Sequence, residues 1–505
     1  MHVSRACAVI VRPDGDTTTY GDVHPLSGDL DQLHLQLLAR GPYSEIVDES
    51  AAAGAVPRWQ LLVFHLPPGG RLVSRLPSAQ EHPGARQRLL SLIDDVVSTQ
   101  ATGPEPPVLV RTDQRPRREQ DLHALAASLG EVVVDGDQVS VVRSDVETVS
   151  TVHERLVNDL LTAWPDLGAE ILTVPAADDA PPLSIRSFGD VVLAPRQIAC
   201  STSAPRVVLP STFRDPSPSR PHLRSLVDWS ARSVLAPVHV EPTPLPGTWF
   251  HFDNVMRGHF GHAMTEQLSL AWAWEQVRAR YPDVRAVAFS WPDHPEAAWE
   301  QQLFAAAGID RYTVLPGPVR VDTLVTATPA YAIGSYLHPE LHATWARTGA
   351  ALESLADAGP RPERVFLSRS GDKRTSLDAA AIEQLATDHG FVVLRPETLP
   401  LPTQVAMVRS AAVVAGYAGS AMFHLALTAR GPRTGSGAGL PVVVISSDTY
   451  PASNEQQICR SLGHHLTLVR GRSLVREGRL VDRLHSDYSL DEPAWAQLRE
   501  AFATA

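Results

Sequence analysis

The chain has 505 residues, and its 56 acidic residues outnumber its 44 basic ones, which gives a formal net charge of −12. This length exceeds what one hydrophobic core usually organises, so we expect about two to four domains. The acidic balance argues against a nucleic-acid partner, because phosphate contacts require a basic face.

Cysteine usage and apolar runs indicate the cellular setting. Cys7, Cys200 and Cys459 are odd in number and far apart, which favours a reduced, cytoplasmic protein over a disulfide framework. The N-terminal residues 1–12 contain too short an apolar run for a signal peptide and are predicted to form a first strand. No later run reaches the roughly 18 apolar residues that span a bilayer. We therefore expect a cytoplasmic protein without a membrane span.

Residues 1–145 are predicted to form a first, smaller α/β domain. Residues 46–47 predict a strand, residues 59–66 a helix, and Pro67-Pro-Gly-Gly70 a turn into the next strand. Further on, Asp135-Gly136 joins two runs of alternating hydrophobicity, which is typical of a β-hairpin.

The pattern from residue 46 to Gly70 resembles the second half of class I methyltransferases, in which a strand ending near an acid precedes a helix and a Pro-Gly-Gly turn. The glycine-rich S-adenosylmethionine loop of that family should lie upstream. Asp14-Gly15 is followed by no second glycine at the required spacing. The resemblance therefore implies a degenerate structural or recognition domain, with methyl transfer as the alternative.

Residues 146–350 are predicted to form a second α/β unit. Helical spacing covers residues 153–164 and 222–234, and a helix beginning near Gly261 would put His262 and Glu266 on one face, four residues apart. The remaining elements expected here are strands at 191–193, 207–209, 286–289, 313–315 and 323–326 and helices at 296–307 and 341–356.

Residues 351–505 show the alternation that is typical of a parallel sheet wound with helices. Short β-branched runs at 364–367, 391–394, 413–416 and 442–446 alternate with segments of helical period, and residues 493–502 predict a final helix. This pattern predicts a Rossmann-like lobe. In such a lobe, ligands bind at the carboxyl ends of the strands.

Three basic side chains follow the first strand of this lobe. Arg369, Lys373 and Arg374 could hold a diphosphate, arginine through bidentate hydrogen bonds and lysine as a compact charge. Lys373 is also the only lysine of the chain. The alternative is that Lys373 and Arg374 form a solvated turn without a ligand.

Further polar positions follow the second and third strands. Glu397 could accept hydrogen bonds from a ribose or sugar hydroxyl. In the turn Gly416-Tyr-Ala-Gly419-Ser420, Gly419 would let the backbone approach a phosphate while a helix begins at Ser420. The alternative is that Gly419 only permits tight packing between strand and helix.

The order of these pieces resembles glycosyltransferase family 61. Its C-terminal lobe has a strand ending in Ser-Arg, a basic loop, a Pro-Glu pair, a helix with Gln-Val and a Gly-Pro-His-Gly-Ala turn. The matching segments here are Leu367-Ser-Arg369, Lys373-Arg374, Pro396-Glu397, Gln404-Val405 and Gly416-Tyr-Ala-Gly419-Ser420. A second motif of the family, Asn-Tyr-Gly-His followed by an acid, looks like Gly258-His-Phe-Gly261-His262 with Glu266. The resemblance covers about Pro246 to Leu468 and departs at Ala418, where the family has histidine.

The resemblance implies an inverting glycosyltransferase that needs a general base for the acceptor hydroxyl and a cationic site for the leaving diphosphate. His262 is the candidate base, with Glu266 orienting it or acting as base itself. His424, where the family often has asparagine, could contact a sugar or phosphate and compensate for Ala418. His259, His262 and Glu266 could instead be read as metal ligands, although no further cluster of such residues accompanies them.

The sequence thus predicts an α/β protein with a GT-B-type pair of Rossmann-like lobes, at 146–350 for the acceptor and 351–505 for the nucleotide sugar. Its expected substrates are a UDP-sugar and a hydroxyl acceptor, such as a glycan or small molecule, and we expect no cofactor and no metal. The alternative is a non-catalytic nucleotide-sugar-binding or scaffolding protein, favoured by Ala418. The sequence leaves open whether the protein is a homodimer.

Overall fold

The computed structural model describes residues 7–10, 23–26, 29–50, 54–104, 117–145, 148–151, 157–177, 179–195, 198–202, 207–209, 233–235, 241–254, 257–290, 296–369, 373–429, 439–478 and 480–505. The chain divides into two compact units, each assembled from separate segments. The first unit comprises Met1–Leu172, Ser184–His251 and Leu315–Ala327, and the second comprises Thr173–Leu183, Phe252–Val314 and Thr328–Ala505. The domain boundaries predicted from the sequence stay predictions.

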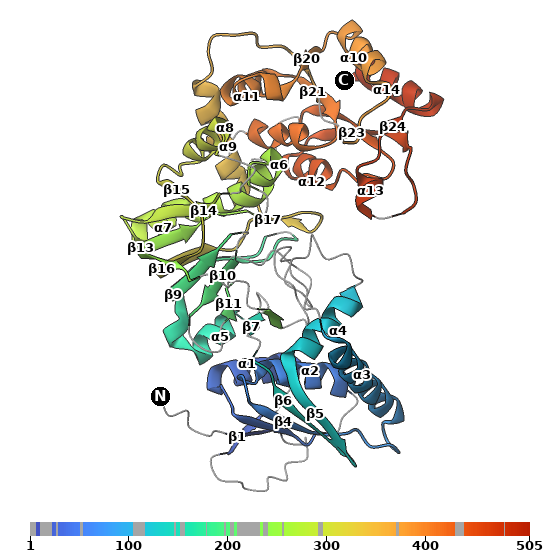
Figure 1. Ribbon diagram of the computed structural model, residues 1–505. Helices are drawn as coiled ribbons and strands as arrows, with labels where there is room; N and C mark the ends of the chain where they lie inside the picture. The colour runs from blue at the N-terminus through green and yellow to red at the C-terminus, as the bar shows by residue number, and fades with distance from the viewer. Residues whose placement is uncertain are drawn as a thin grey trace. The chain divides into compact units, whose positions relative to one another are not determined.

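The first unit begins with a six-stranded sheet of order β2-β1-β3-β4-β6-β5 (Figure 1). The strands β1 to β4 are parallel, and β5 and β6 form the predicted antiparallel hairpin at the edge beyond β4. The elements are β1 (Cys7–Ile10), β2 (Val23–Leu26), α1 (Leu30–Arg40), β3 (Glu45–Asp48), α2 (Ala55–His65), β4 (Arg71–Arg75), α3 (Pro83–Thr102), α4 (Arg117–Ser128), β5 (Leu129–Asp135) and β6 (Gln138–Arg143).

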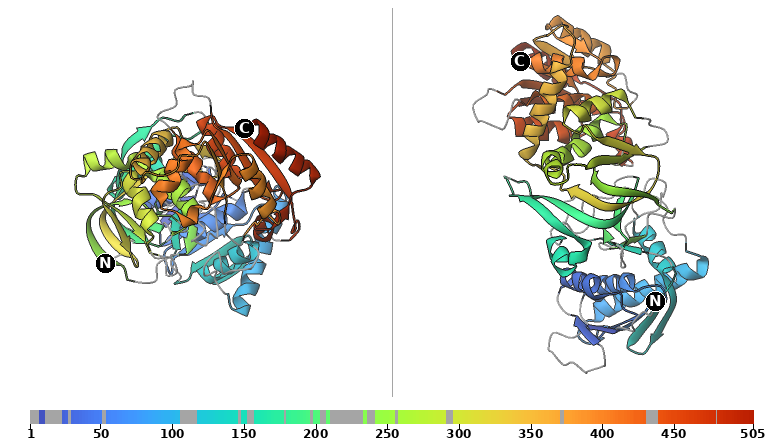
Figure 2. Two further views of the ribbon diagram at one scale, coloured as in Figure 1. Left: turned by 90° about the horizontal axis from the view of Figure 1, so that it is seen from above. Right: turned by 90° about the vertical axis from the view of Figure 1, so that its left-hand side faces the viewer.

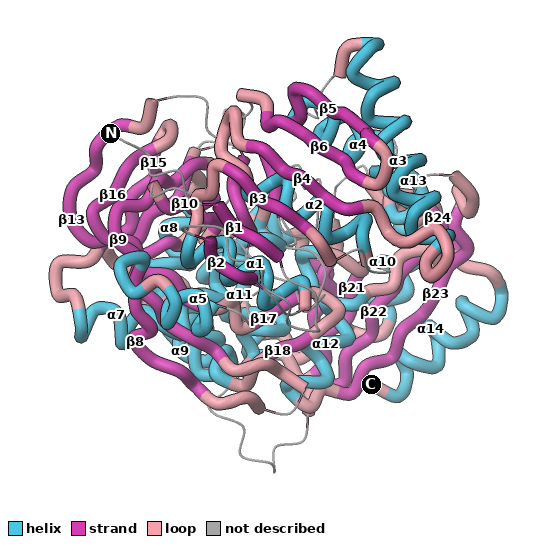
Figure 3. The backbone as a smooth tube through the Cα atoms, turned by 90° about the horizontal axis from the view of Figure 1, so that it is seen from below, coloured by secondary structure: helices cyan, strands magenta, loops and turns pink. Residues whose placement is uncertain are grey.

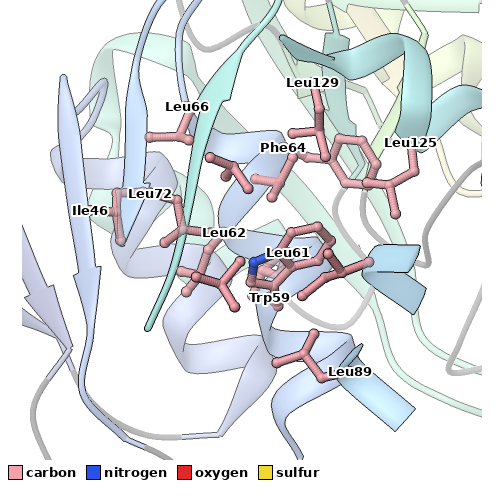
Figure 4. Close-up of a cluster of buried hydrophobic side chains, with 14 of the residues drawn as sticks. Ile46, Trp59, Leu61, Leu62, Phe64, Leu66, Leu72, Leu89, Leu125 and Leu129 are labelled. Atoms are coloured by element: carbon pink, nitrogen blue, oxygen red, sulfur yellow. The ribbon is translucent and has the colours of Figure 1, made fainter. Parts of the chain in front are cut away.

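Helix α2 is at the centre of the core of this sheet (Figure 4). It begins at Ala55, earlier than predicted, because Pro57 in its first turn is compatible with helix geometry. The side chains of Trp59, Leu62 and Phe64 are buried against strand residues such as Leu72. A helix that is apolar on nearly all sides belongs in a core. Asp14-Gly15 lies outside the described residues, and the similarity to methyltransferases stays a prediction.

The rest of the first unit is a mixed sheet of order β12-β7-β11-β10-β9-β16-β13, with β8 paired to β9. Strand β9 runs antiparallel to β16, and β13 runs parallel to β16. The elements are β7 (Thr148–Thr151), α5 (Val157–Ala163), η2 (Pro165–Leu167), β8 (Gly168–Val174), β9 (Leu183–Ala194), β10 (Ile198–Ser201), β11 (Val207–Val208), β12 (Ser233–Leu235), β13 (Thr243–His251) and β16 (Val319–Ala327).

Two predictions for this region need comment. The helix predicted over 222–234 is wrong at its end, where residues 233–235 form β12, and its earlier residues lie outside the described ones. Val234 pairs with Val149 of β7, so pairing within the sheet overrides the helical spacing. Because β9 and β16 are antiparallel, the described pairing differs from an all-parallel Rossmann sheet. The GT-B-type pair of lobes stays a prediction.

The segment Phe252–Val314 of the second unit begins with helical turns that carry the histidines of the sequence motif. A helix does begin at Phe260, as predicted, but it continues as a π-helical and then a 3₁₀ turn. The elements are α6 (Phe260–His262), η4 (Ala263–Gln267), η5 (Leu268–Ala273), α7 (Trp274–Arg280), β14 (Arg285–Phe289), α8 (Ala298–Ala306), β15 (Tyr312–Leu315), β17 (Tyr331–Ala332), β18 (Tyr336–Leu337) and α9 (Glu340–Ser354).

The C-terminal part of this unit is a sheet of order β20-β19-β21-β22-β23-β24, in which all pairs are parallel except β23 with β24. Figure 3 shows β21, β22 and β23 as neighbouring strands. The strands are β19 (Arg364–Leu367), β20 (Val392–Leu394), β21 (Val413–Tyr417), β22 (Pro441–Ser447), β23 (His465–Ser473) and β24 (Tyr488–Ser489). In chain order this is 2-1-3-4-5, the flavodoxin-like arrangement, so the predicted parallel sheet is confirmed here.

Helices cover this C-terminal sheet. They are α10 (Ala379–Asp388), η6 (Pro396–Thr398), α11 (Leu401–Ser410), η7 (Ser420–Thr428), α12 (Ser453–Leu462), α13 (Leu480–Leu484) and α14 (Glu492–Thr504). The final helix α14 packs beside β23 (Figure 2, left), and its Phe502 meets Phe366 of β19 in the core. Among the described helices, none combines the length and apolar character that a bilayer crossing requires.

Candidate functional site

The sheet order places a ligand crevice between β19 and β21. From β19 the chain crosses to β20 on one side and then returns to β21 on the other side, so the connections diverge between β19 and β21. Such a switch point leaves a crevice at the carboxyl ends of the two strands. Ser368 and Arg369 follow β19 there, and Ala418 and Gly419 follow β21. Several of the predicted donor-binding residues therefore lie at the strand ends where this topology favours a ligand.

A cavity of about 770 Å³ lies at these strand ends within the second unit. This volume is within the range of about 300–1,000 Å³ that small-molecule sites occupy. The predicted residues that line it are Arg369, Lys373, Arg374, Glu397, Gly419, Ser420 and His424. The other lining residues are His259, Phe260, Ala298, Trp299, Gln302, Ser368, Pro396, Leu399, Pro400, Leu401, Gln404, Tyr417 and Ala421.

Arg369 and Arg374 meet at Gly419. The Nη1 atom of Arg369 donates to the carbonyl oxygen of Ala418 at 3.3 Å. A Cβ atom added to Gly419 would lie 3.3 Å from Arg374 Nη2 and 3.4 Å from Arg369 Nη1, so both guanidinium groups lie against the bare backbone of the turn. Burial and the neighbouring Arg374 lower the pKa of Arg369. Two guanidinium groups brought this close favour an anion between them.

Arg374 is held in an uncommon backbone conformation. Its φ of 55° lies in the left-handed region, which non-glycine residues rarely adopt. Its backbone N–H donates to the carbonyl oxygen of His485 at 3.1 Å, and its guanidinium lies 4.3 Å from the ring centroid of Tyr450. Such outliers cluster at binding sites, where the surrounding structure maintains them. Lys373 beside it is exposed at the cavity, and residues 370–372 lie outside the described ones.

The turn after β21 differs in detail from the sequence-based expectation. The helix does begin at Ser420, but it is a 3₁₀ helix rather than an α-helix. The N–H of Gly419 donates to Oε1 of Glu455 at 2.6 Å, so this amide already has a partner. The first amides of a helix have no acceptor within the helix, which leaves the turn suited to an anion.

The predicted catalytic pair, His262 and Glu266, lies close to the cavity without lining it. Nδ1 of His262 lies 2.7 Å from Oε1 of Glu266, so the two side chains share a face as predicted. Neither is among the described residues that line the cavity. His259 does line it, and its ring centroid lies 5.0 Å from that of His262. The side chain of His259 is exposed at the cavity, yet desolvation of its ring, together with the nearby His262, Lys373 and Arg374, lowers its pKa to about 4.

Buried contacts fix the segment that carries these histidines. Glu300 of α8 accepts a hydrogen bond from the N–H of Gly258 at 3.2 Å and pairs with the fully buried Arg257 at 3.4 Å. On the other side, a Cβ atom added to Gly261 would lie 2.6 Å from Oγ of Ser420. The histidine segment and the Ser420 turn are therefore in direct contact, and a side chain at position 261 would have to displace Ser420.

The loop after β20 forms another wall of the cavity. Nε2 of Gln404 donates to the carbonyl oxygens of Pro396 at 2.6 Å and of Leu399 at 2.7 Å, which holds the short turn that carries Glu397. Glu397 itself is exposed and lines the cavity. The Gln-Val part of the sequence motif thus supports the Pro-Glu part.

His424 and Gly416 have different surroundings. His424 is buried, stacks on Phe260 with ring centroids 4.8 Å apart, and contacts the carbonyl oxygen of Ala421 through Nδ1 at 2.8 Å. Burial lowers its pKa to about 4, and among the described residues its Nε2 atom has no hydrogen-bond partner. Gly416 is away from the cavity lining. A Cβ atom there would lie 2.5 Å from the carbonyl oxygen of Leu367, so its glycine serves strand packing.

Several residues of the site were missed in the sequence. Tyr450 and Glu455 follow β22 in the chain and contact Arg374 and Gly419, respectively. Phe260 and Trp299 form an aromatic wall of the cavity, with ring centroids 5.5 Å apart. The motif did contain Phe260, but nothing in the local pattern around Glu455 or Trp299 distinguishes them from ordinary helix residues. In the part of the chain that the structure describes, no group of three or more His, Cys, Asp or Glu side chains could hold a metal ion.

Comparison with known proteins agrees with this location. Residues 260–435 match the model of a family described as Glycosyltransferase 61. The matched segment includes His262 and Glu266 as well as the strand ends with Arg369 and Gly419. The match supports the resemblance to glycosyltransferase family 61 and, with it, a glycosyltransferase. No curated protein shows a significant match to the chain.

Proposed function

We propose that the protein is an inverting glycosyltransferase that transfers a sugar from a UDP-sugar to a hydroxyl acceptor without a metal ion. The observation that carries this proposal is the meeting of Arg369, Arg374 and Gly419 at the switch point of the C-terminal sheet, inside a cavity of about 770 Å³. The match to glycosyltransferase family 61 over residues 260–435 supports the reaction class.

The diphosphate of the donor is assigned to the turn at Gly419. As the bond between sugar and phosphate breaks, negative charge grows on the leaving diphosphate. Arg369 and Arg374 stabilise this charge from the two sides of the turn, and the exposed Lys373 adds a third cation. Glu397 and Nε2 of His424, which has no hydrogen-bond partner among the described residues, are placed for hydroxyl groups of the ribose or the sugar.

In this proposal, His262 is the general base that accepts the proton of the acceptor hydroxyl. Nδ1 lies 2.7 Å from Oε1 of Glu266, which holds the ring in place, and Nε2 is the proposed proton acceptor. The oxygen of the acceptor attacks the anomeric carbon as its proton moves to His262, and UDP leaves from the opposite face, which inverts the configuration. His259 lies between His262 and the cavity, and it is neutral at pH 7 because its pKa is about 4.

UDP binding tests the donor site. We expect the intact protein to bind UDP and Arg369→Ala to bind it about 10- to 100-fold more weakly, because a charged hydrogen-bond donor is lost. Titration calorimetry on both proteins measures this difference. Arg499→Ala is the matched control, since Arg499 is half exposed on α14 and pairs with Glu492, outside the residues that line the cavity. Equal affinity of the Arg369 variant and the intact protein would remove the donor site from this lobe.

The second candidate function is non-catalytic binding of a nucleotide sugar. Ala418 favours it, because this position carries histidine in the family that the chain resembles. A binding protein would keep its UDP affinity and its cellular role in a His262→Ala variant. An enzyme would keep only the affinity.

A further inference from the structure

A buried carboxyl group lies directly beneath the turn at Gly419. Glu455, in the first turn of α12, is 0 % exposed. Its Oε1 atom accepts the N–H of Gly419 at 2.6 Å, and among the described residues its Oε2 atom accepts no hydrogen bond. This is an unusual arrangement, because a buried carboxylate normally has partners for both oxygens. The turn proposed to hold phosphates therefore rests on an acidic side chain.

The surroundings of Glu455 offer it little compensation for a negative charge. Burial raises its pKa to about 7, whereas the hydrogen bonds from its own N–H and from Gly419 and the charge of Arg374 lower it. The titratable and charged groups that interact with it are Arg374 after β19, Tyr450 before α12, Tyr331 of β17 and Cys459 of α12, and beyond these tyrosines lie Arg369 and Glu266. Arg374 is the one cation that acts on it directly among these groups.

We infer that Glu455 is a positioning residue for the donor diphosphate, which holds the Gly419 turn through its carboxyl group and takes up one proton when the diphosphate binds between Arg369 and Arg374. The inference rests on the function proposed above. In the empty site, the charge of an ionised Glu455 is balanced by Arg374. A bound diphosphate brings negative charge to the same guanidinium group, and two anions in a poorly solvated site repel each other. Protonation of the carboxyl group relieves this repulsion and leaves its other oxygen as the acceptor for Gly419.

The sign of the pH dependence follows from this linkage. The bound state holds more protons than the empty state, so affinity for the diphosphate falls as the pH rises through about 7. With one proton, the loss approaches tenfold for each pH unit above that point. The terminal phosphate of UDP titrates near pH 6 and acts in the opposite direction, so a variant without the carboxyl group must serve as the reference.

The experiment compares the intact protein with Glu455→Gln and Glu455→Ala. UDP binding is measured by calorimetry at pH 6, 7 and 8 in buffers of low and high ionisation enthalpy, which together give the number of protons taken up. We expect the intact protein to take up a substantial fraction of a proton near pH 7.5. Glu455→Gln keeps an oxygen acceptor for Gly419, so it should lose this uptake and bind UDP up to about tenfold more tightly than the intact protein at pH 8. Glu455→Ala lacks the acceptor and should bind more weakly than Glu455→Gln at every pH.

The outcomes separate this inference from the proposed function. If the intact protein binds UDP with no net proton uptake once the protons released by the nucleotide are added back, the role of Glu455 is refuted, and this result requires no variant to fold. Equal binding by Glu455→Gln and Glu455→Ala would refute the positioning part. If the intact protein binds no UDP at any of the three pH values, the donor site itself fails and the inference falls with it. Glu492→Gln, on the exposed face of α14, is the control for loss of an acidic side chain.

Discussion

The contact between His262 and Glu266 sets the direction of proton transfer in the proposed reaction. Glu266 is buried while His262 is partly exposed, with side-chain exposures of 6 % and 16 %. The carboxylate can therefore fix the ring, and an acceptor that binds in the cavity reaches the ring past His259. The opposite assignment, with Glu266 as the base, would require the acceptor to pass the imidazole.

We predict that His262→Ala lowers the rate of sugar transfer by about 100- to 10,000-fold and leaves the affinity for UDP unchanged, because a general base acts on the acceptor and not on the donor. Turnover assays with calorimetry on the same samples measure both quantities. His465→Ala is a suitable control, because His465 is exposed at the start of β23. An equal loss of UDP affinity would make His262 a binding residue instead.

Sequence alone could predict most of the polar side chains that line the cavity but not what supports them. Arg369, Lys373, Arg374 and Gly419 were predictable because each follows a strand, and the ends of parallel strands converge at one edge of a sheet. Glu455 was not predictable, because its contact joins residues on two elements through a single hydrogen bond and leaves no periodic pattern.

At the scale of elements, the turn between β21 and η7 depends on the absence of a side chain. Gly419 has φ of 138°, a conformation that L-residues rarely adopt, and its missing Cβ makes room for both arginines. We predict that Gly419→Ala destabilises the protein by about 1–3 kcal/mol and weakens UDP binding by roughly tenfold or more. Denaturant unfolding and calorimetry measure the two effects.

The control for this substitution is Gly359→Ala. Gly359 is exposed in the same unit, and the nearest atom to an added Cβ is a carbonyl oxygen at an ordinary 3.8 Å. If Gly419→Ala bound UDP as tightly as this control, the close approach of the backbone to a phosphate would be the wrong explanation for the glycine.

The helices and strands were predictable where the hydrophobic residues follow a single helix or strand pattern. The β-branched runs of β19, β21 and β22 indicate buried parallel strands, and the structure pairs them in that way. Strand β9 extends from Leu183 to Ala194, whereas only residues 191–193 were expected, because Arg186 and Asp190 interrupt its apolar pattern. The π-helical turn η4 has no sequence signature either, since its residues are ordinary helix formers in a buried segment.

At the scale of the whole molecule, cations are concentrated at one cavity of a strongly acidic chain. The formal net charge is −12, yet Arg369, Lys373 and Arg374 lie together at the proposed donor site. We predict that dialysis against a chelator leaves both UDP affinity and transfer rate unchanged within about twofold, because these side chains supply the positive charge that a metal ion would otherwise bring. Full recovery of activity only on addition of a divalent cation would contradict this prediction.

The division of the chain was the least predictable feature. Both compact units consist of three separate segments, and a short stretch, Leu315–Ala327, leaves the second unit to pair in the sheet of the first. Composition and linker patterns are read along the sequence, so they cannot reveal that separate segments of the chain join in one unit. For this reason the predicted order of domains, with a methyltransferase-like domain first, stays a prediction.

Lys373 also has a practical value. It is the only lysine in 505 residues, and its side chain is exposed at the cavity. Apart from the α-amino group, which has a lower pKa than lysine, a reagent selective for primary amines therefore meets a single side chain, located where the donor is proposed to bind. The unmodified sequence thus offers a built-in attachment point for a fluorophore or a photo-crosslinker beside the cavity, and no engineered cysteine is needed to install one.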